Sequence, residues 1–463
     1  MTTAPEEAVE TSNRFSHWLR RFWVPLVLVV AALGVSGTIT VMHGDSMSPI
    51  DEWVYSDYLD KLPEQGVVYQ GEAIGDEALE RMACDGVLLY GPMGPDCGED
   101  YSDLSEFPFS GITSADAYTP VYFAITRVVG DGIAFVTGVD ELTGWRLTGP
   151  LWLAATMIVF WLLLRRWNVP PLATLGLGLT LIASPFGWWT YTWVSTDAPS
   201  FLAGALMLLL ASRYVDGRGS GWWLVLVAAV ALAFKTTNIL AVCLAALYLL
   251  IVWLSELRTT EWRGVRTRRP TVGDRSSFAL LGFAVLSLAA AAATQFGWLA
   301  LRRVLAKGEP ADQAIAGQLD RLETLSQMAN FLPGTITSNV NLVGTADYAL
   351  PFPNWSVMPL SWLCIAGVIG AFWQLSGTSR RSPLVIAIAI SAIAFAPMLA
   401  IVIQLTTGSY FPLPPRYGAP ILAGFLLAAG MTMRNRWAHW LLIAYMIPLI
   451  GATVYLTALL AKY

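Results

Sequence analysis

The chain alternates long apolar runs with polar segments. Most of the runs carry few or no charges and approach the length that a helix needs to cross a bilayer, about 20 residues at about 1.5 Å each. They lie at 22–42, 144–164, 172–190, 197–214, 221–235, 238–254, 278–301, 356–376, 383–405, 417–433 and 437–461. The pattern predicts an all-α polytopic membrane protein with about 11 transmembrane helices.

Two long polar regions interrupt these runs. Residues 43–142 form an acidic first loop, and its amphipathic end at 119–140 is typical of helices that lie on a membrane. Residues 303–355 form a second loop, where spaced apolar residues predict a surface helix over 308–330. The rest of this second loop is either a connector or a cover over a site.

Composition supports the membrane assignment. Of 463 residues, 55% are hydrophobic and 13% charged, which excludes an ordinary water-soluble domain. The first run is too long for the core of a cleaved signal peptide and lacks a small-residue cleavage pattern, so we expect it to remain as a span. Residues 1–21 are then an N-terminal segment, and 22–463 form a single transmembrane domain.

Charge orients the predicted spans. Arginines concentrate in the N-terminal segment and in every second loop, for example at Arg165, Arg218, Arg381 and Arg434, whereas the other loops are longer and acidic. By the positive-inside rule, the N-terminus is cytoplasmic and the C-terminus extracytoplasmic, in a plasma membrane.

The cysteines fit this orientation. Cys84 and Cys97 lie in the first outer loop, whereas Cys243 and Cys364 lie in apolar runs. Because disulfides persist in oxidising compartments, we expect a Cys84–Cys97 disulfide, with two free thiols as the alternative.

Candidate chemistry gathers where the chain leaves the first span. Carboxylates and phenols lie close together there, and the candidates among them are Asp45, Asp51, Glu52, Tyr55 and Tyr58. Aromatic rings stack on sugar faces while carboxylates bind hydroxyl groups, so the mixture suits a sugar site; an interfacial aromatic belt is the alternative.

Asp51 also has a simpler interpretation. With Ser48 as N-cap and Pro49 at the first helical position, Asp51 at the third would complete a capping box. A single cap does not need Asp45 and Glu52 as well, so both interpretations remain open.

Four further segments carry a resemblance. The Asp-Glu pair after the first span resembles the acidic pair at the same place in the GT-C superfamily of membrane glycosyltransferases, which use polyprenyl-phosphate sugars. Segments similar to that family's motifs follow in the same order, at Tyr118–Phe123 (YTPVYF), Ser195–Pro199 (STDAP), Leu232–Thr237 (LAFKTT) and Tyr410–Tyr417 (YFPLPPRY). Tyr118 and Thr119 replace a histidine and a proline of the family pattern.

The resemblance implies roles for particular residues. Asp51 would be the general base that activates an acceptor hydroxyl, with Glu52 beside it. Tyr122, Asp197 and Tyr417 would contribute to substrate binding. In several branches the acidic pair helps to hold a divalent metal such as Mg or Mn, although no closed ligand set is evident here.

Two cations are candidates for binding the phosphate of a lipid donor. Lys235 lies between two apolar runs, where an unpaired charge costs about 2.5–3.5 kcal/mol on insertion scales. Its alternative is snorkelling to the interface. Arg416 follows Pro412, Pro414 and Pro415, and its planar fork suits a phosphate. Its alternative is anchoring a span.

The sequence therefore predicts an integral-membrane glycosyltransferase. It would move a sugar from a polyprenyl-phosphate donor to an envelope glycan, lipid or protein on the extracytoplasmic face. A transporter or flippase of a lipid-linked precursor, or a non-catalytic envelope scaffold, are the alternatives. No motif for nucleic-acid binding occurs.

Overall fold

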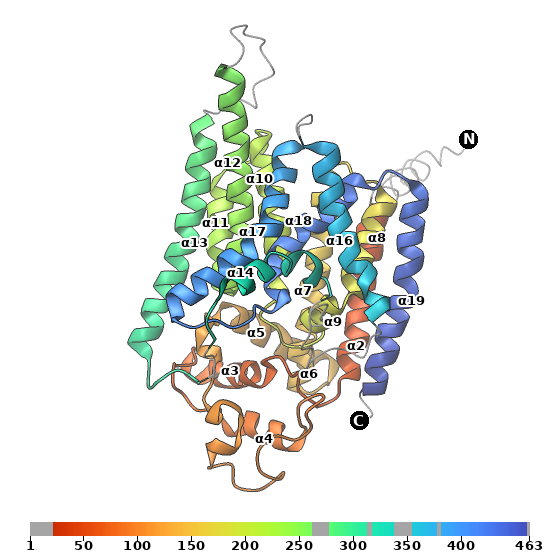
Figure 1. The fold of residues 1–463 in the computed structure, drawn as a ribbon. Coiled ribbons are helices and arrows are strands. Elements are labelled where there is room, and N and C mark those ends of the chain that lie inside the picture. Colours follow the sequence, from red (N-terminus) through yellow and green to blue (C-terminus); the bar gives the residue numbers. More distant parts are fainter. Residues whose placement is uncertain (1–21, 262–276, 313–316, 338–353, 377–380, 461–463) are drawn as a thin grey trace, which may run out of the picture.

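The computed structural model describes residues 22–261, 277–312, 317–337, 354–376 and 381–460. Across these residues the fold is helical, and the only β contacts are isolated bridges. Long helices stand side by side as a bundle, and the first loop covers one end of it (Figure 1). We call this end the loop end.

The first part of the chain forms one span and the cover at the loop end. The span Phe22–Met42 contains a π-helical turn at Ala32–Ser36 and ends as α2 (Gly37–Met42). The cover consists of α3 (Glu52–Gln65), α4 (Asp76–Cys84), the short helices η2 (Leu104–Glu106), η3 (Pro108–Gly111) and η4 (Ala115–Ala117), α5 (Pro120–Thr137) and α6 (Glu141–Arg146).

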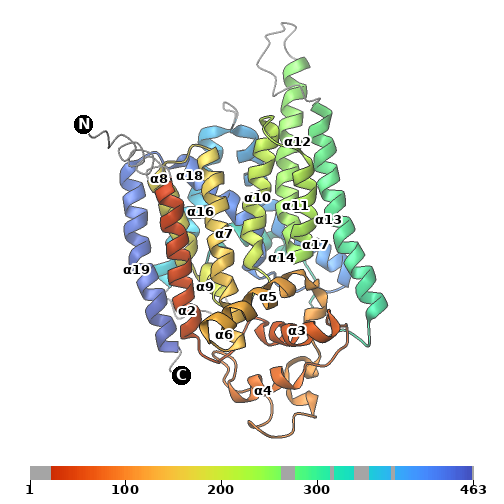
Figure 2. The same cartoon turned by 180° about the vertical axis from the view of Figure 1, so that it is seen from behind.

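The remaining helices form most of the bundle. They are α7 (Thr148–Arg166), α8 (Pro171–Ala183), α9 (Pro185–Tyr191), α10 (Ala198–Val215), α11 (Trp222–Phe234), η5 (Thr236–Asn238), α12 (Ile239–Glu261), α13 (Ser277–Leu305), α14 (Arg321–Gln327), α15 (Phe331–Gly334), α16 (Asn354–Leu375), α17 (Ser382–Thr407), η6 (Pro415–Gly418), α18 (Ala419–Thr432) and α19 (Arg436–Leu460). Turned by 180°, the bundle shows α5 crossing the loop end obliquely beside α3 and α6 (Figure 2).

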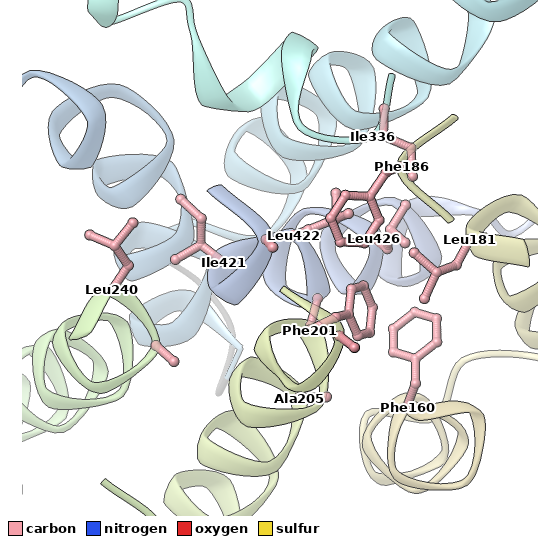
Figure 3. Packing of buried hydrophobic residues seen from close by; sticks show 14 of the residues in the cluster. Phe160, Leu181, Phe186, Phe201, Ala205, Leu240, Ile336, Ile421, Leu422 and Leu426 are labelled. Atoms are coloured by element: carbon pink, nitrogen blue, oxygen red, sulfur yellow. The ribbon is translucent and has the colours of Figure 1, made fainter. Parts of the chain in front are cut away.

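Helix α18 lies at the centre of the bundle. It is apolar on every side, and residues 419–431 are all buried, as expected for a helix surrounded by others. Side chains of α7, α8 and α10 converge on Leu422 and Leu426 (Figure 3). Gly204 of α10 permits this packing, because a Cβ there would overlap the carbonyl of Pro420.

The predicted number of spans is only partly reproduced. In the described part of the chain, nine helices are long and apolar enough to cross a membrane, or ten if the bent pair α8–α9 is one span. Eight of the nine match expected runs, and the ninth is α5, which we expected to lie on the membrane. Two expected spans are short helices, α11 and α18.

Two further local predictions are reproduced only in part. The run 172–190 breaks at Ser184, and the helices on either side, α8 and α9, are bent by 62°. The hydroxyl of Ser184 accepts a hydrogen bond from Gly187 N–H at 3.0 Å, and Pro185 occupies the first position of α9. Proline and a serine cap both favour a new helix start. The expected surface helix over 308–330 is limited to α14, which begins at a capping box on Asp320.

Side-chain contacts stabilise the first loop, and one of them, the disulfide, was predicted. Cys84 and Cys97 form a disulfide. Lys61 Nζ lies 2.9 Å from Asp57, and Arg81 Nη1 lies 2.8 Å from Asp60. The loop is therefore a folded cover over the loop end.

Candidate active site

Helix α3 begins one residue after Asp51. Asp51 occupies the preceding position in the left-handed conformation, φ 58°, and its side chain makes no capping hydrogen bond. The hydroxyl of Ser48 instead accepts from Ile50 N–H at 3.1 Å. The capping-box interpretation, with the helix starting at Pro49, was therefore wrong. Aspartate is among the few residues that tolerate this backbone conformation, which directs its carboxylate away from the helix start.

Glu52 points into the protein, away from Asp51. Its side chain is fully buried and receives two hydrogen bonds from Arg146, Nε to Oε1 and Nη2 to Oε2, both at 2.9 Å. The backbone N–H groups of Ser48 and Val194 donate to the same carboxylate at 2.7 and 2.9 Å. With four donors, this carboxylate has no room for a substrate hydroxyl.

Arg146 joins three parts of the chain through this pair. It also donates to the carbonyls of Gly44 and Ser46 at 2.6 and 2.8 Å, and its guanidinium lies 4.6 Å from the centroid of the Trp193 ring. The end of the first span, the start of α3 and the turn before α10 are thereby fixed relative to one another. Sequence reasoning missed Arg146, although an arginine at the outer start of an apolar run was a signal.

The carboxylate of Asp51 faces a cluster of charges from distant segments. Its Oδ2 lies 3.7 Å from Arg416 Nη2. Arg416 Nε lies 3.4 Å from Oδ2 of Asp197, and Lys235 Nζ donates to Oδ1 of Asp197 at 2.7 Å. Lys235 and Asp197 are nearly inaccessible, at 5% and 4% side-chain exposure, whereas Asp51 is 36% exposed. We call these four residues the charged cluster.

Phenol and hydroxyl groups border the charged cluster. Tyr55 OH lies 3.5 Å from Oδ2 of Asp51 and 3.2 Å from both Tyr118 OH and Thr196 Oγ1. Burial is the main cause that raises the pKa of Tyr55 and of Tyr118, and the nearby Asp51 charge adds to it. Both phenols are therefore neutral near pH 7 and serve as hydrogen-bond partners.

Aromatic rings also lie near Lys235. Its Nζ is 5.8 Å from the centroid of the Tyr118 ring and 5.6 Å from that of Tyr417, distances at which a cation is attracted to a ring. Neither Tyr118 nor Thr196 was predicted as a site residue. Tyr118 appeared only as a departure from the family pattern.

Several polar atoms on the segments that carry the charged cluster have no hydrogen-bond partner among the residues that the structure describes. They are Arg416 Nε, Ser200 Oγ, Thr237 Oγ1 and Asn238 Oδ1, and all four atoms are buried. Ser200 lies in the first turn of α10 after Asp197, and Thr237 and Asn238 follow Lys235. Because an unpaired buried polar group is costly, the region retains hydrogen-bonding capacity for a polar ligand.

The second loop holds the segment that carries Arg416. Asn330 donates to the carbonyl of Leu413 at 2.8 Å, and Thr335 Oγ1 donates to that of Pro415 at 3.0 Å. Gln327 donates to Tyr410 OH at 2.9 Å. This loop therefore contributes to the site by positioning η6. Residues 331–355, expected to form either a connector or a cover, lie largely outside the described residues, in 338–353.

The structure brings together six of the predicted site residues, namely Asp51, Tyr55, Asp197, Lys235, Arg416 and Tyr417. Tyr122 is adjacent, because its hydroxyl accepts from Ser195 N–H at 3.0 Å, beside Asp197.

Three predicted residues lie elsewhere. Glu52 is enclosed by its own donors, as described above. Asp45 is exposed near Asp85, whose pKa its charge helps to raise after the larger effect of burial. Tyr58 is fully buried with its ring stacked on Phe123, the centroids being 3.9 Å apart.

The charged cluster does not fit a divalent metal. Both of its carboxylates face cationic side chains, and among the residues that the structure describes no group of three or more His, Cys, Asp or Glu side chains could hold a metal ion. Hard divalent cations need several oxygen ligands.

Comparison with known proteins finds a match over part of the chain. Residues 121–263 match the model of the dolichyl-phosphate-mannose-protein mannosyltransferase family. This segment contains Tyr122, Asp197 and Lys235 but neither Asp51 nor Arg416. No curated protein matches the chain.

Two solved structures have a similar arrangement of helices. One is ArnT from Cupriavidus metallidurans bound to undecaprenyl phosphate, with a TM-score of 0.48 and 17% identity over 90% of this chain and 61% of that one. The other is the oligosaccharyltransferase of Archaeoglobus fulgidus, tethered to an acceptor peptide, with a TM-score of 0.43 and 13% identity over 96% and 55%. The chain thus spans about three fifths of the length of these structures.

Proposed function

We propose that the protein is a membrane glycosyltransferase that moves a sugar from a polyprenyl-phosphate donor to a hydroxyl-bearing acceptor of the cell envelope. The observation that carries the proposal is the charged cluster, in which the partly exposed carboxylate of Asp51 lies near the partly buried Arg416 and the buried Lys235 at one end of a membrane bundle. The match of residues 121–263 to a family of sugar transferases supports the same chemistry.

Asp51 is the general base in this proposal. Its carboxylate is accessible and is not engaged by backbone N–H groups, unlike that of Glu52. The acceptor oxygen forms a bond to the anomeric carbon of the sugar, and its proton passes to Asp51. The bond from that carbon to the donor phosphate breaks, and its electron pair stays on the phosphate oxygen. A positioned base contributes about 10²–10⁴-fold to such a step.

Arg416 and Lys235 bind the departing phosphate. The contacts of Arg416 to the two carboxylates, 3.4 and 3.7 Å, are longer than the roughly 2.7–2.9 Å of a charge-assisted hydrogen bond, so its donors remain available to an anion. Asp197 holds Lys235 in place by accepting a hydrogen bond from its ammonium group through Oδ1. Fixed cations that meet developing charge stabilise the transition state.

Glu52 is a positioning residue in this account. Its buried pair with Arg146 sets where α3 begins and hence where Asp51 projects. The resemblance implied that Glu52 acts beside Asp51 in catalysis, but its four donors support a structural role instead.

The site faces the extracytoplasmic side of the plasma membrane in this proposal. In the described part of the chain, the helix ends that carry Arg166, Arg213 and Arg436 lie at the end of the bundle opposite the loop end (Figure 2), which agrees with a cytoplasmic N-terminus and an extracytoplasmic C-terminus. The disulfide in the first loop also suits an oxidising compartment. A donor embedded in the outer leaflet would then reach the cluster from the membrane.

Transfer assays with a panel of polyprenyl-phosphate sugars and envelope acceptors test the proposal. We expect wild-type protein to transfer with at least one donor, and Asp51→Asn to lose about 10²-fold or more of kcat, because an amide accepts no proton. The matched control is Asp103→Asn, whose carboxylate lies in the exposed part of the loop and accepts only from Ser105. Transfer by Asp51→Asn at the control's rate would overturn the assignment of the base.

A further inference from the structure

A cavity of about 630 Å³ lies at the end of the bundle opposite the loop end. Its lining comes from the helix ends that meet there, and it consists of Asn168, Pro170, Leu375, Arg381, Gly430, Met431, Met433 and Arg434. Two of these side chains are guanidinium groups and none is acidic. The charged cluster contributes nothing to it, so this cavity is separate from the proposed active site.

We propose that this cavity binds the phosphate of an anionic lipid head group from the leaflet at that end of the bundle. Two arginines around one opening form a positive site, and a guanidinium fork matches a phosphate. This inference depends only on the chain being embedded in a membrane and does not rest on the proposed transferase activity.

Arg381 is already held in place at the cavity. Its Nη2 donates to the carbonyl of Trp167 at 2.9 Å, just after the end of α7. That contact fixes the side chain and satisfies a carbonyl that would otherwise repel an anion. Similarly, His439 Nε2 lies 3.1 Å from the carbonyl of Met433, just after the end of α18.

Helix starts also contribute to the cavity. Pro170 and Arg381 are the N-cap residues of α8 and α17, and neither helix has a capping side chain there. The positive end of a helix dipole favours an anion near its first turn. Together with the two guanidinium groups, these helix starts give a positive potential to an otherwise largely apolar cavity.

The surroundings of the cavity indicate a lipid head group rather than a free phosphate. Trp373, close to the end of α16, is 86% exposed, and Trp437, close to the start of α19, is 73% exposed. Exposed tryptophans at helix ends mark the depth of the lipid head groups. Apolar side chains such as Leu375 and Met433 would contact the lipid's glycerol and upper acyl region.

Native mass spectrometry of the full-length protein in detergent tests the inference. Dissociation constants are measured for phosphatidylglycerol, for phosphatidylcholine and for inorganic phosphate. We expect phosphatidylglycerol to bind at least about fivefold more tightly than phosphatidylcholine, and inorganic phosphate alone to bind weakly, because it lacks the apolar contacts. Equal binding of the two lipids, or tight binding of phosphate alone, would overturn the inference.

Arg434→Gln is the decisive variant, because Arg434 is exposed and makes no contact that the fold depends on among the described residues. Removing one basic residue near an anionic head group should weaken phosphatidylglycerol binding about fivefold. The matched control is Arg436→Gln. Arg436 is two residues further along the chain, is also exposed and does not line the cavity, so the variant removes the same charge outside the site. Equal losses in both variants would show general surface attraction and would contradict a site.

Discussion

Glu52→Gln should destabilise the fold strongly. The substitution removes the charge that balances Arg146, whose side chain is fully buried. Breaking one partner of a buried ion pair costs about 3–5 kcal/mol, because it leaves an uncompensated charge in a medium of low dielectric. The amide also turns one N–H₂ group toward donors of Arg146, Ser48 or Val194, so part of the four-donor arrangement is lost as well.

Titration of the detergent-solubilised protein with SDS, followed by circular dichroism, measures this loss. Glu77→Gln is the control, since Glu77 is 73% exposed and lies 3.7 Å from Arg81, a surface pair worth at most about 1 kcal/mol. The double variant Glu52→Gln/Arg146→Gln should recover part of the stability, because it removes the unbalanced charge. If Glu52→Gln costs no more than Glu77→Gln, the structural role assigned to this pair is refuted.

Two further predictions concern the loops around the site. Burial raises the pKa of Asp60 to about 6, against the lowering effect of nearby Arg81. The folded state therefore binds the proton of Asp60 more tightly than the unfolded chain does, so stability should fall as pH rises from about 4 to 6. Asp60→Asn should flatten this pH dependence, which thermal unfolding curves recorded at each pH would measure. An Asp60→Asn variant with the same pH dependence of stability as wild type would contradict the raised pKa of Asp60. Thr335→Val removes the hydroxyl that donates to the Pro415 carbonyl, at a cost of about 1 kcal/mol in stability. This variant should raise the KM for the donor more than it lowers kcat. Thr324→Val, on the exposed face of α14, should change neither KM nor kcat. Equal effects of the two threonine variants would mean that the second loop does not position Arg416.

Much of the helical architecture was predictable because hydropathy depends on local sequence. Eight of the expected runs are helices long enough to span, and the disulfide in the first loop followed from the sidedness of the loops. The break at Ser184 was also readable, since Ser-Pro is a helix-start signal, but the apolar character of the whole run concealed it.

The site was predictable only in part, because its geometry depends on contacts between distant segments. Asp51 and Glu52 are neighbours in sequence, yet one faces Arg416 and the other Arg146. What separates them is the left-handed backbone at Asp51, which no residue pattern in the loop required. Asp197 was predicted from the resemblance to a known family, and Lys235 and Arg416 from their positions and charge, whereas Arg146 belongs to no motif and was missed.

The most direct test of the account separates binding of the donor phosphate from transfer. Dissociation constants of a polyprenyl phosphate should be measured for wild type, Arg416→Gln and Asp51→Asn. A charge-assisted hydrogen bond is worth about 1.5–3 kcal/mol, so Arg416→Gln should bind about 10–150-fold more weakly. Asp51→Asn should bind at least as tightly as wild type while failing to transfer, because it loses a carboxylate that competes for Arg416. If Asp51→Asn loses as much affinity as Arg416→Gln, Asp51 is not the base and the arrangement proposed here is wrong.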